Sequence, residues 1–299
     1  MNEGFRGVLK FSGGVFVLAV FAIVLSKNLD AVRLVFSIDP VQLLLLLALT
    51  VVMFVINGLL IKYMMTVFDI QLPFSEYFGL GILTSIGNYV LPLRGGASLR
   101  AVYLKKKFKF PYKTFVSTLM GMYILVFCVY GGIGFLASIF QQFLNGGTVL
   151  MLPAFYLALF LAPLAFIVFH PKTGFARVDL VFDGWGEIKR SRVFPTLILV
   201  EVFDALARVF LMYAIFFSIG VEISFSYVVF VTVVNVFSLF INILPANIGV
   251  RELVITLASQ AGGASVEAGL AVALVLRGTE VLGLMLCSPF ALRIFRGSR

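Results

Sequence analysis

The sequence predicts an all-α polytopic membrane protein with six transmembrane helices and two re-entrant helical hairpins. Apolar residues make up 61% of the 299 residues and charged residues only 12%, whereas a soluble domain is about 25% charged. Long apolar runs recur without the two-residue alternation of membrane strands. Basic residues concentrate in a few loops, which orients the runs. This composition excludes an ordinary soluble enzyme and a disordered chain.

Six plain apolar runs predict the spans, because each is close to the ~20 residues that cross the hydrocarbon. They cover residues 8–26, 41–61, 114–140, 149–169, 195–219 and 266–290. Two further apolar segments, 77–92 and 225–260, are interrupted at Leu91-Pro92 and Leu244-Pro245. Because proline removes a backbone donor and clashes with the preceding turn, each pair predicts a break in a helix.

The distribution of Lys and Arg predicts that both interrupted segments re-enter the membrane on the side from which they came. If both crossed it, residues 94–113 would carry seven basic and no acidic side chains outward, against the positive-inside rule. If both re-enter, the inner segments carry 18 Lys and Arg and the outer segments carry two. These inner segments are residues 1–10, 62–76, 93–113, 170–194 and 291–299. We therefore expect a cell (inner) membrane location, with both termini cytoplasmic.

The re-entrant arrangement predicts a single membrane domain, 1–299, built from two inverted half-repeats, 1–147 and 148–299. Each half contains two spans, a re-entrant segment and a third span. Pro92 and Gly96 are matched by Pro245 and Gly249 at the same offset of 153 residues. Paired proline- and glycine-interrupted segments in inverted halves are typical of transporter binding sites near the midplane. The alternative is that the two breaks coincide by chance.

The first break predicts an anion site. A broken helix exposes unpaired N–H groups at a partly positive end. Arg94 and Arg100 follow it, and guanidinium groups match phosphate oxygens in a fixed fork. Gly95 and Gly96 would let the backbone approach a phosphate, with Asn88 in support. The alternative is that both arginines are ordinary cytoplasmic flanking charges.

The second break carries charge at bilayer depth. Arg251 and Glu252 follow it, and such charges are costly in a membrane and usually functional. Because adjacent residues point apart on a helix, we expect the two to have different partners. The supporting polar and glycine positions here are Asn242, Asn247 and Gly249.

Other charges inside the predicted spans could share this site. Glu201, Asp204 and Arg208 fall on one helix face, and Arg277 lies three residues before Glu280. We expect a polar cavity in which Arg94, Arg100, Arg251 and Arg277 bind phosphate. The charge-balancing or proton-coupling residues would be Glu201, Asp204, Arg208, Glu252 and Glu280. The alternative is a structural network of salt bridges.

Catalysis, cofactors and metals are not expected. The single His170 cannot build a histidine metal site, and Cys128 and Cys287 both lie in apolar runs. No Ser/His/Asp set or activated cysteine is recognisable. The net charge of +9 is explained by topology and does not indicate nucleic-acid binding. The oligomeric state stays open.

Two stretches, Asn88 to Lys105 and Leu244 to Glu252, resemble the lysylphosphatidylglycerol synthase transmembrane-region family, also called flippase-like. The first stretch departs from the family pattern, because Ala97 and Ser98 stand where a Glu often follows the glycine. The resemblance implies lipid translocation between leaflets, or a membrane part of a lipid-modifying system. It covers no soluble aminoacyltransferase domain, so we do not expect synthesis of aminoacylated lipid.

The expected function is movement of an anionic lipid, or of a sugar- or prenyl-phosphate-linked lipid intermediate, between leaflets. Membrane lipids are thus the expected partners. One alternative is a proton-coupled transporter of a small soluble anion, which needs a closed aqueous cavity. A second is a non-transporting partner of a cell-envelope glycosyltransferase, in which the intramembrane charges would all be paired and dry.

Overall fold

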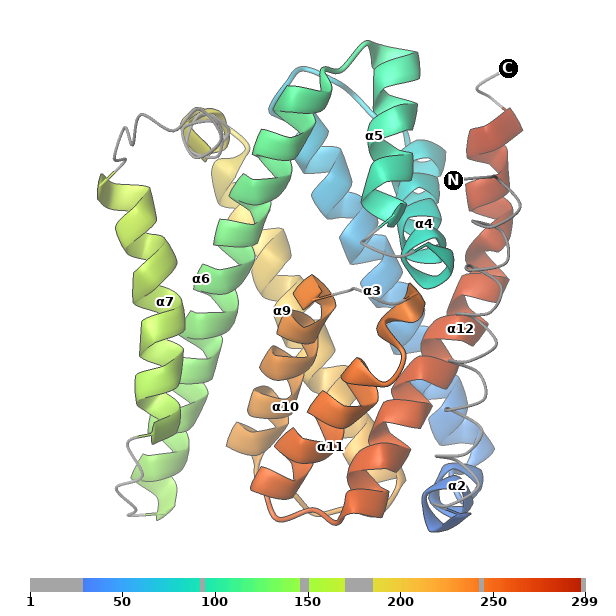
Figure 1. The fold of residues 1–299 in the computed structure, drawn as a ribbon, viewed down its shortest axis with the longest axis vertical. Helices are drawn as coiled ribbons and strands as arrows, with labels where there is room; N and C mark the ends of the chain where they lie inside the picture. The colour runs from blue at the N-terminus through green and yellow to red at the C-terminus, as the bar shows by residue number, and fades with distance from the viewer. Residues whose placement is uncertain (1–28, 92–94, 146–150, 170–184, 242–244, 297–299) are drawn as a thin grey trace, which may run out of the picture.

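The protein is a bundle of α-helices (Figure 1). The computed structural model describes residues 29–91, 95–145, 151–169, 185–241 and 245–296, and these contain helices and no strand. Its predicted all-helical class is therefore confirmed for this part of the chain. The first predicted span, 8–26, lies outside the described residues.

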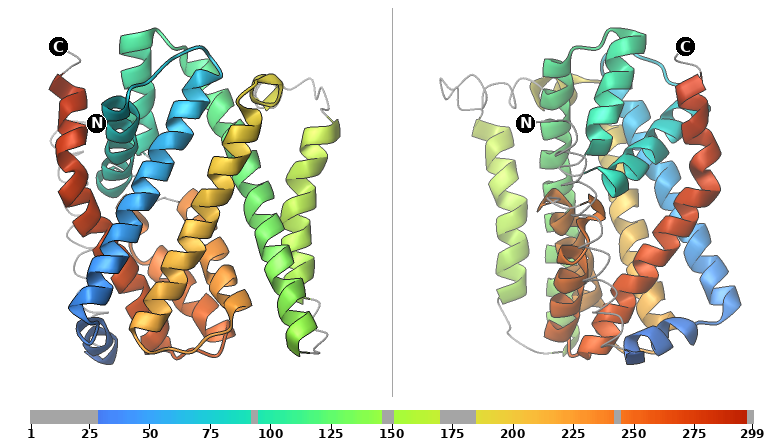
Figure 2. Two further views of the ribbon diagram at one scale, coloured as in Figure 1. Left: turned by 180° about the vertical axis from the view of Figure 1, so that it is seen from behind. Right: turned by 45° about the vertical axis from the view of Figure 1, so that its right-hand side comes forward.

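Five long helices of the described part lie lengthwise in the bundle (Figures 1 and 2). They are α3 (Pro40–Thr66), α6 (Tyr112–Asn145), α7 (Met151–Phe169), α9 (Phe194–Ser218) and α12 (Val266–Arg296). Each corresponds to one predicted apolar run. Among the described residues, three stretches are both long and apolar enough to cross a membrane: 40–66, 112–143 and 266–294.

Two pairs of short helices meet in the middle of the bundle from opposite ends. One pair, α4 (Phe74–Val90) and α5 (Gly95–Phe108), fills the upper half in Figure 1. The other, α10 (Phe225–Ser238) and α11 (Val250–Ala261), fills the lower half, joined through short 3-10 turns η1 (Leu239–Ile241) and η2 (Pro245–Asn247). Helices are thus interrupted at both predicted breaks, although Pro92 itself lies outside the described residues.

The basic segment 93–113, expected as an inner loop, is not a loop throughout, because residues 95–108 form α5. This helix is half-buried: its first turns pack on α4, and its basic residues Lys105 to Lys107 lie in its last turn. Cations are favourable there because the carbonyl end of a helix is partly negative. A further short helix, α2 (Leu29–Phe36), follows the first apolar run.

Local signals explain where several helices begin and end. Asp39 caps α3 by accepting a hydrogen bond from Val41 N at 2.8 Å, and Pro40 starts the helix with a preset φ. Ser265 Oγ accepts from Ala268 N at 3.1 Å at the start of α12. Gly263, with φ of 89°, turns the chain from α11 into α12 in a conformation that favours glycine.

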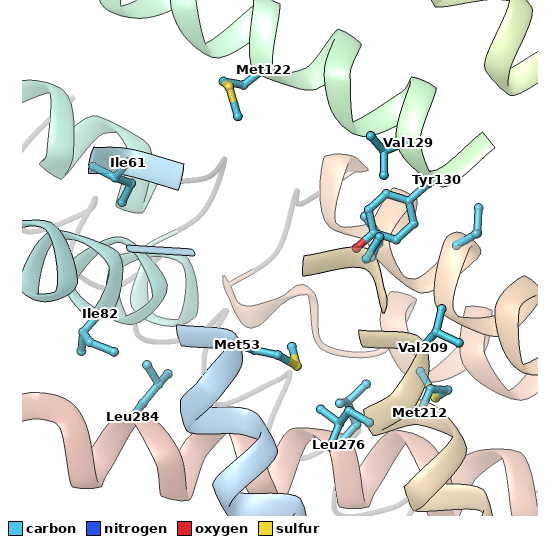
Figure 3. Packing of buried hydrophobic residues seen from close by; sticks show 14 of the residues in the cluster. Met53, Ile61, Ile82, Met122, Val129, Tyr130, Val209, Met212, Leu276 and Leu284 are labelled. Atoms are coloured by element: carbon cyan, nitrogen blue, oxygen red, sulfur yellow. The ribbon is translucent and has the colours of Figure 1, made fainter. Parts of the chain in front are cut away.

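Helix α9 has two chemically different faces, which orient the site. Phe203, Phe210 and Phe217, spaced by seven residues, are 56–69% exposed, as expected of side chains that face lipid. Glu201 and Asp204 on the other face are 2% and 4% exposed. These acids are thus buried within the bundle. Figure 3 shows how buried apolar side chains from α3, α4, α6, α9 and α12 pack together in it.

Candidate functional site

An arginine–glutamate pair joins four helices at the centre of the bundle. Arg251 of α11 donates from Nη1 and Nη2 to the two oxygens of Glu280 on α12, at 2.5 and 2.7 Å. Its Nε donates to Asn235 Oδ1 on α10 at 2.8 Å. Tyr89 Oη of α4 donates to the same carboxylate at 2.6 Å. The fork of Arg251, which is only 4% exposed, is therefore fully engaged by a carboxylate.

A second pair fixes the break before α11. Arg277 Nη2 of α12 lies 2.6 Å from Glu252 Oε1, and its Nη1 donates to the Ala246 carbonyl at 3.2 Å. The other Glu252 oxygen accepts from Gly249 N at 2.7 Å and so caps α11. Arg251 and Glu252 thus have different partners, as expected for neighbours on a helix.

The backbone at this break adopts a left-handed conformation. Ala246 and Asn247 have φ of 55° and 52°, and Gly249 has φ of 86°. Asn247 Nδ2 donates to the Ser238 carbonyl at 2.9 Å, which links the break to the end of α10. Non-glycine residues with positive φ persist only where surrounding contacts hold them, and the Arg277 and Asn247 hydrogen bonds are such contacts.

The acidic face of α9 carries one acid in an ion pair and one that has no ion-pair partner in the described part of the chain. Arg208 donates from Nε and Nη2 to Asp204 at 2.7 and 3.2 Å, and Tyr130 Oη of α6 lies 3.4 Å from the same carboxylate. Glu201, one turn earlier, forms no ion pair with a described residue, and its Oε2 accepts no hydrogen bond from one.

At the first break the glycines serve helix packing. A Cβ on Gly96 would lie 1.8 Å from the Thr84 carbonyl oxygen of α4, so α5 can approach α4 this closely only with glycine there. Gly96 N donates to Asn88 Oδ1 at 3.1 Å. The Gly96 N–H is therefore bonded within the protein, while Asn88 also lines both cavities described below. Gly95 is likewise buried, against Leu91.

Arg100 lies inside the bundle and is not a flanking charge on the surface. Its side chain is buried, at 7% exposure, and its guanidinium lies 5.3 Å from the ring centre of Phe115 on α6. The surface cations are further along α5, where Lys107 forms an ion pair with Glu76 of α4. The hydrogen bond to that carboxylate raises the pKa of Lys107.

Two adjoining cavities connect these residues. One, of about 150 Å³, is lined by Arg208, Arg251 and Glu280, with Asn247 and Asn88 among its polar groups. The other, of about 250 Å³, is lined by Arg100 and Glu201. Asn57, Asn88 and Leu239 line both. Together they are large enough for several water molecules, whose polar partners are present.

The two cavities bring together seven of the predicted site residues: Asn88, Arg100, Glu201, Arg208, Asn247, Arg251 and Glu280. The other predicted site residues that the structure describes line neither cavity: Gly95, Gly96, Asp204, Gly249, Glu252 and Arg277. Two more are not placed. Arg94 and Asn242 lie outside the described residues. Sequence reasoning missed Asn57, Tyr89 and Asn235 as members of the site. The signal for the two asparagines was available, since each is an amide within an otherwise apolar helix.

A comparison with protein families agrees with this architecture. Residues 11–287 match the family described as the lysylphosphatidylglycerol synthase TM region. The chain belongs to this family. Membership makes it a membrane protein from a lipid-handling context, and the match extends over both breaks. No curated protein and no solved structure matches the chain.

Proposed function

We propose that this membrane protein translocates an anionic, phosphate-bearing lipid or lipid-linked intermediate between leaflets and is not an enzyme. The observation that carries the proposal is the pair of adjoining cavities lined by Arg100, Arg208 and Arg251 inside an otherwise apolar bundle. Buried arginines suit phosphate because their donors match its oxygens. Membership of a lipid-related membrane family supports a lipid as the source of that phosphate.

The topology that goes with this function is six spans and two re-entrant hairpins, with half-repeats 1–147 and 148–299. The opposed positions of the α4/α5 and α10/α11 pairs support it (Figure 1). The C-terminal ends of α3, α5 and α12 also lie together at the upper end in Figure 1. These ends adjoin or belong to three of the segments that the positive-inside rule assigns to the inner side, so we assign the upper end to the cytoplasm of a cell (inner) membrane. Each hairpin would then bring its break to the substrate near the midplane.

The pairing of charges bears on the alternatives. A non-transporting partner of a glycosyltransferase predicts that all intramembrane charges are paired and dry, and three arginines do have acidic partners. The two cavities and the unpaired oxygen of Glu201 favour transport instead.

The test is reconstitution of the full chain in liposomes with lipids labelled on the hydrocarbon tail and a reductant that bleaches only the outer leaflet. We expect wild-type protein to expose inner-leaflet labelled phosphatidylglycerol or polyprenyl phosphate to the reductant, and to leave labelled diacylglycerol at the rate of empty liposomes. Equal acceleration of the neutral lipid would contradict an arginine site. Uptake of soluble phosphate without lipid movement would favour the small-anion alternative.

Arg251→Lys tests, in the same assay, whether the paired donors of the Arg251 guanidinium act on the substrate. Lysine keeps the charge but loses the paired donors, so we expect translocation to slow by about tenfold or more, equivalent to ~1.4 kcal/mol. The control is Arg293→Lys, an exposed arginine near the end of α12. An Arg251→Lys protein with the wild-type rate would show that the fork does not act on the substrate.

A further inference from the structure

The buried acids in and around the two cavities are not equivalent. Asp204, Glu252 and Glu280 each hold an arginine at 2.5–2.7 Å, so protonating any of them breaks a buried ion pair. Glu201 is 2% exposed, and its Oε2 accepts no hydrogen bond from a described residue. With respect to the described residues, it is the one of these four acids that can take up a proton without releasing an arginine.

The groups that face Glu201 come from several helices. Its own helix supplies Asp204 and Arg208, which already form a pair with each other. Helix α6 supplies Tyr130 and Tyr123, and α5 supplies Arg100, which lines the same 250 Å³ cavity. Asn57 of α3 and Thr84 of α4 add uncharged polar groups. Water held by such groups can carry a proton to the carboxylate.

An anion that enters this cavity changes the charge around Glu201. Among the described residues on the walls of this cavity, Arg100 is the one cation and Glu201 the one acid. A phosphate would add a negative charge inside a poorly screened interior, and repulsion from the Glu201 carboxylate would oppose its binding. Uptake of one proton by Glu201 removes that repulsion. Because linkage is reciprocal, anion binding then promotes proton binding and the reverse.

Resting on the proposed function, we infer that Glu201 is the proton-binding residue that couples translocation of the anionic lipid to a proton gradient. A proton from solvent on one side binds a Glu201 carboxylate oxygen when the phosphate enters. It leaves to solvent on the other side when the phosphate departs. One proton then accompanies one phosphate charge, so the step is electrically neutral.

The first experiment measures protons without transport. Purified full-length protein in a weakly buffered detergent solution receives short-chain phosphatidylglycerol, and a pH indicator reports proton uptake. We expect about one proton per bound lipid for wild type and none for Glu201→Gln, which keeps the side-chain size. The matched control, Glu187→Gln, changes an exposed glutamate outside the cavity and should behave as wild type. Lipid binding without proton uptake by the wild type overturns the inference.

The second experiment measures coupling in liposomes with labelled phosphatidylglycerol. One proton per lipid and a gradient of one pH unit should enrich the probe in one leaflet up to about tenfold for the wild type. Glu201→Gln should still translocate the probe but equalise the leaflets, and Glu201→Asp, which can again be protonated, should restore enrichment. Enrichment that persists in Glu201→Gln, or that follows a sodium gradient instead, overturns the inference.

These outcomes separate the inference from the proposed function. If the wild-type protein moves the probe with no response to pH, the coupling role of Glu201 is refuted and translocation is still supported. If the wild-type protein takes up a proton on binding lipid but moves no lipid, the proposed function is refuted and Glu201 is still supported as a proton-binding site.

Discussion

Arg251 and Glu280 each depend on the other inside the bundle. Arg251→Ala would leave the Glu280 carboxylate, 12% exposed, with only the Tyr89 hydroxyl as a partner among the contacts described above. Removing one member of a buried ion pair costs about 3–5 kcal/mol. We therefore expect Arg251→Ala to lower the free energy of unfolding by that amount, measured by denaturation in detergent micelles.

The double variant Arg251→Ala/Glu280→Gln shows whether Arg251→Ala loses stability because Glu280 is left as an unpaired charge or because the arginine side chain itself is missing. Because Gln is uncharged, the double variant should be more stable than Arg251→Ala alone. If it is less stable by the sum of both single effects, the pair does not couple the two residues.

The hydrogen bond from Tyr89 to Glu280 can be tested with a smaller change in the side chain. Tyr89→Phe removes one hydrogen bond to a charged group at 2.6 Å and little else. Hydrogen bonds of this kind contribute about 1.5–3 kcal/mol, and we expect a loss of that size in unfolding free energy. Tyr213→Phe, at a 45% exposed position on α9, should change it by no more than about 0.5 kcal/mol. Equal effects would refute the role of the Tyr89 hydroxyl.

At the scale of helices, the contact between α4 and α5 depends on glycine. A methyl group at Gly96 meets backbone at 1.8 Å, and backbone cannot move aside as a side-chain tip can. We expect Gly96→Ala to lower the unfolding free energy by at least the ~1–3 kcal/mol typical of overpacking.

Gly278→Ala is the matched control for that substitution. Gly278 lies within α12, and a Cβ there meets no atom within 4 Å. Alanine should be neutral or stabilise by up to about 1 kcal/mol, because it favours the helix. If Gly96→Ala is as stable as Gly278→Ala, the close approach is not needed.

The long helices were predictable because a run of about 20 apolar residues has few other folds in a membrane. The breaks were predictable from Pro92 and Pro245. Helix α5 was not, since its lysines gave it the composition of a loop. Nor was the end of α10, which stops at Ser238, several residues before the Leu244-Pro245 pair.

The membership of the site was largely predictable, but its pairing was not. Intramembrane charges stand out in an apolar sequence, which identified Glu201, Arg251 and Glu280. Spacing along a helix says which residues share a face, and nothing about distances between helices. The sequence placed Arg277 near Glu280, yet each pairs with a residue of α11.

At the scale of the whole molecule, sidedness can be tested with single cysteines in a Cys128→Ala/Cys287→Ala background. Lys106 lies in the last turn of α5 and Gln260 at the end of α11, and both are exposed. If the upper end of the bundle is cytoplasmic, an impermeant thiol reagent outside intact cells should label Gln260→Cys and leave Lys106→Cys unlabelled.

Permeabilised cells supply the control for that experiment, because both positions should then react. Labelling of Lys106→Cys from outside in intact cells would mean that the α4/α5 pair enters from the outer side. That result would remove the inverted relation between the two hairpins.

The Glu280 carboxylate acts on Arg251 as a built-in competitor. It is tethered a few ångströms from the guanidinium, so its effective concentration far exceeds that of any free anion. In the proposed function, an incoming phosphate would exchange with it and gain only the difference between two similar sets of hydrogen bonds. Such a site would bind phosphate weakly, and Glu280 would re-form its contact with Arg251 as the phosphate leaves. Binding would then be weak and release fast, so the site would be occupied mainly where the anion is concentrated, as it is within a lipid leaflet.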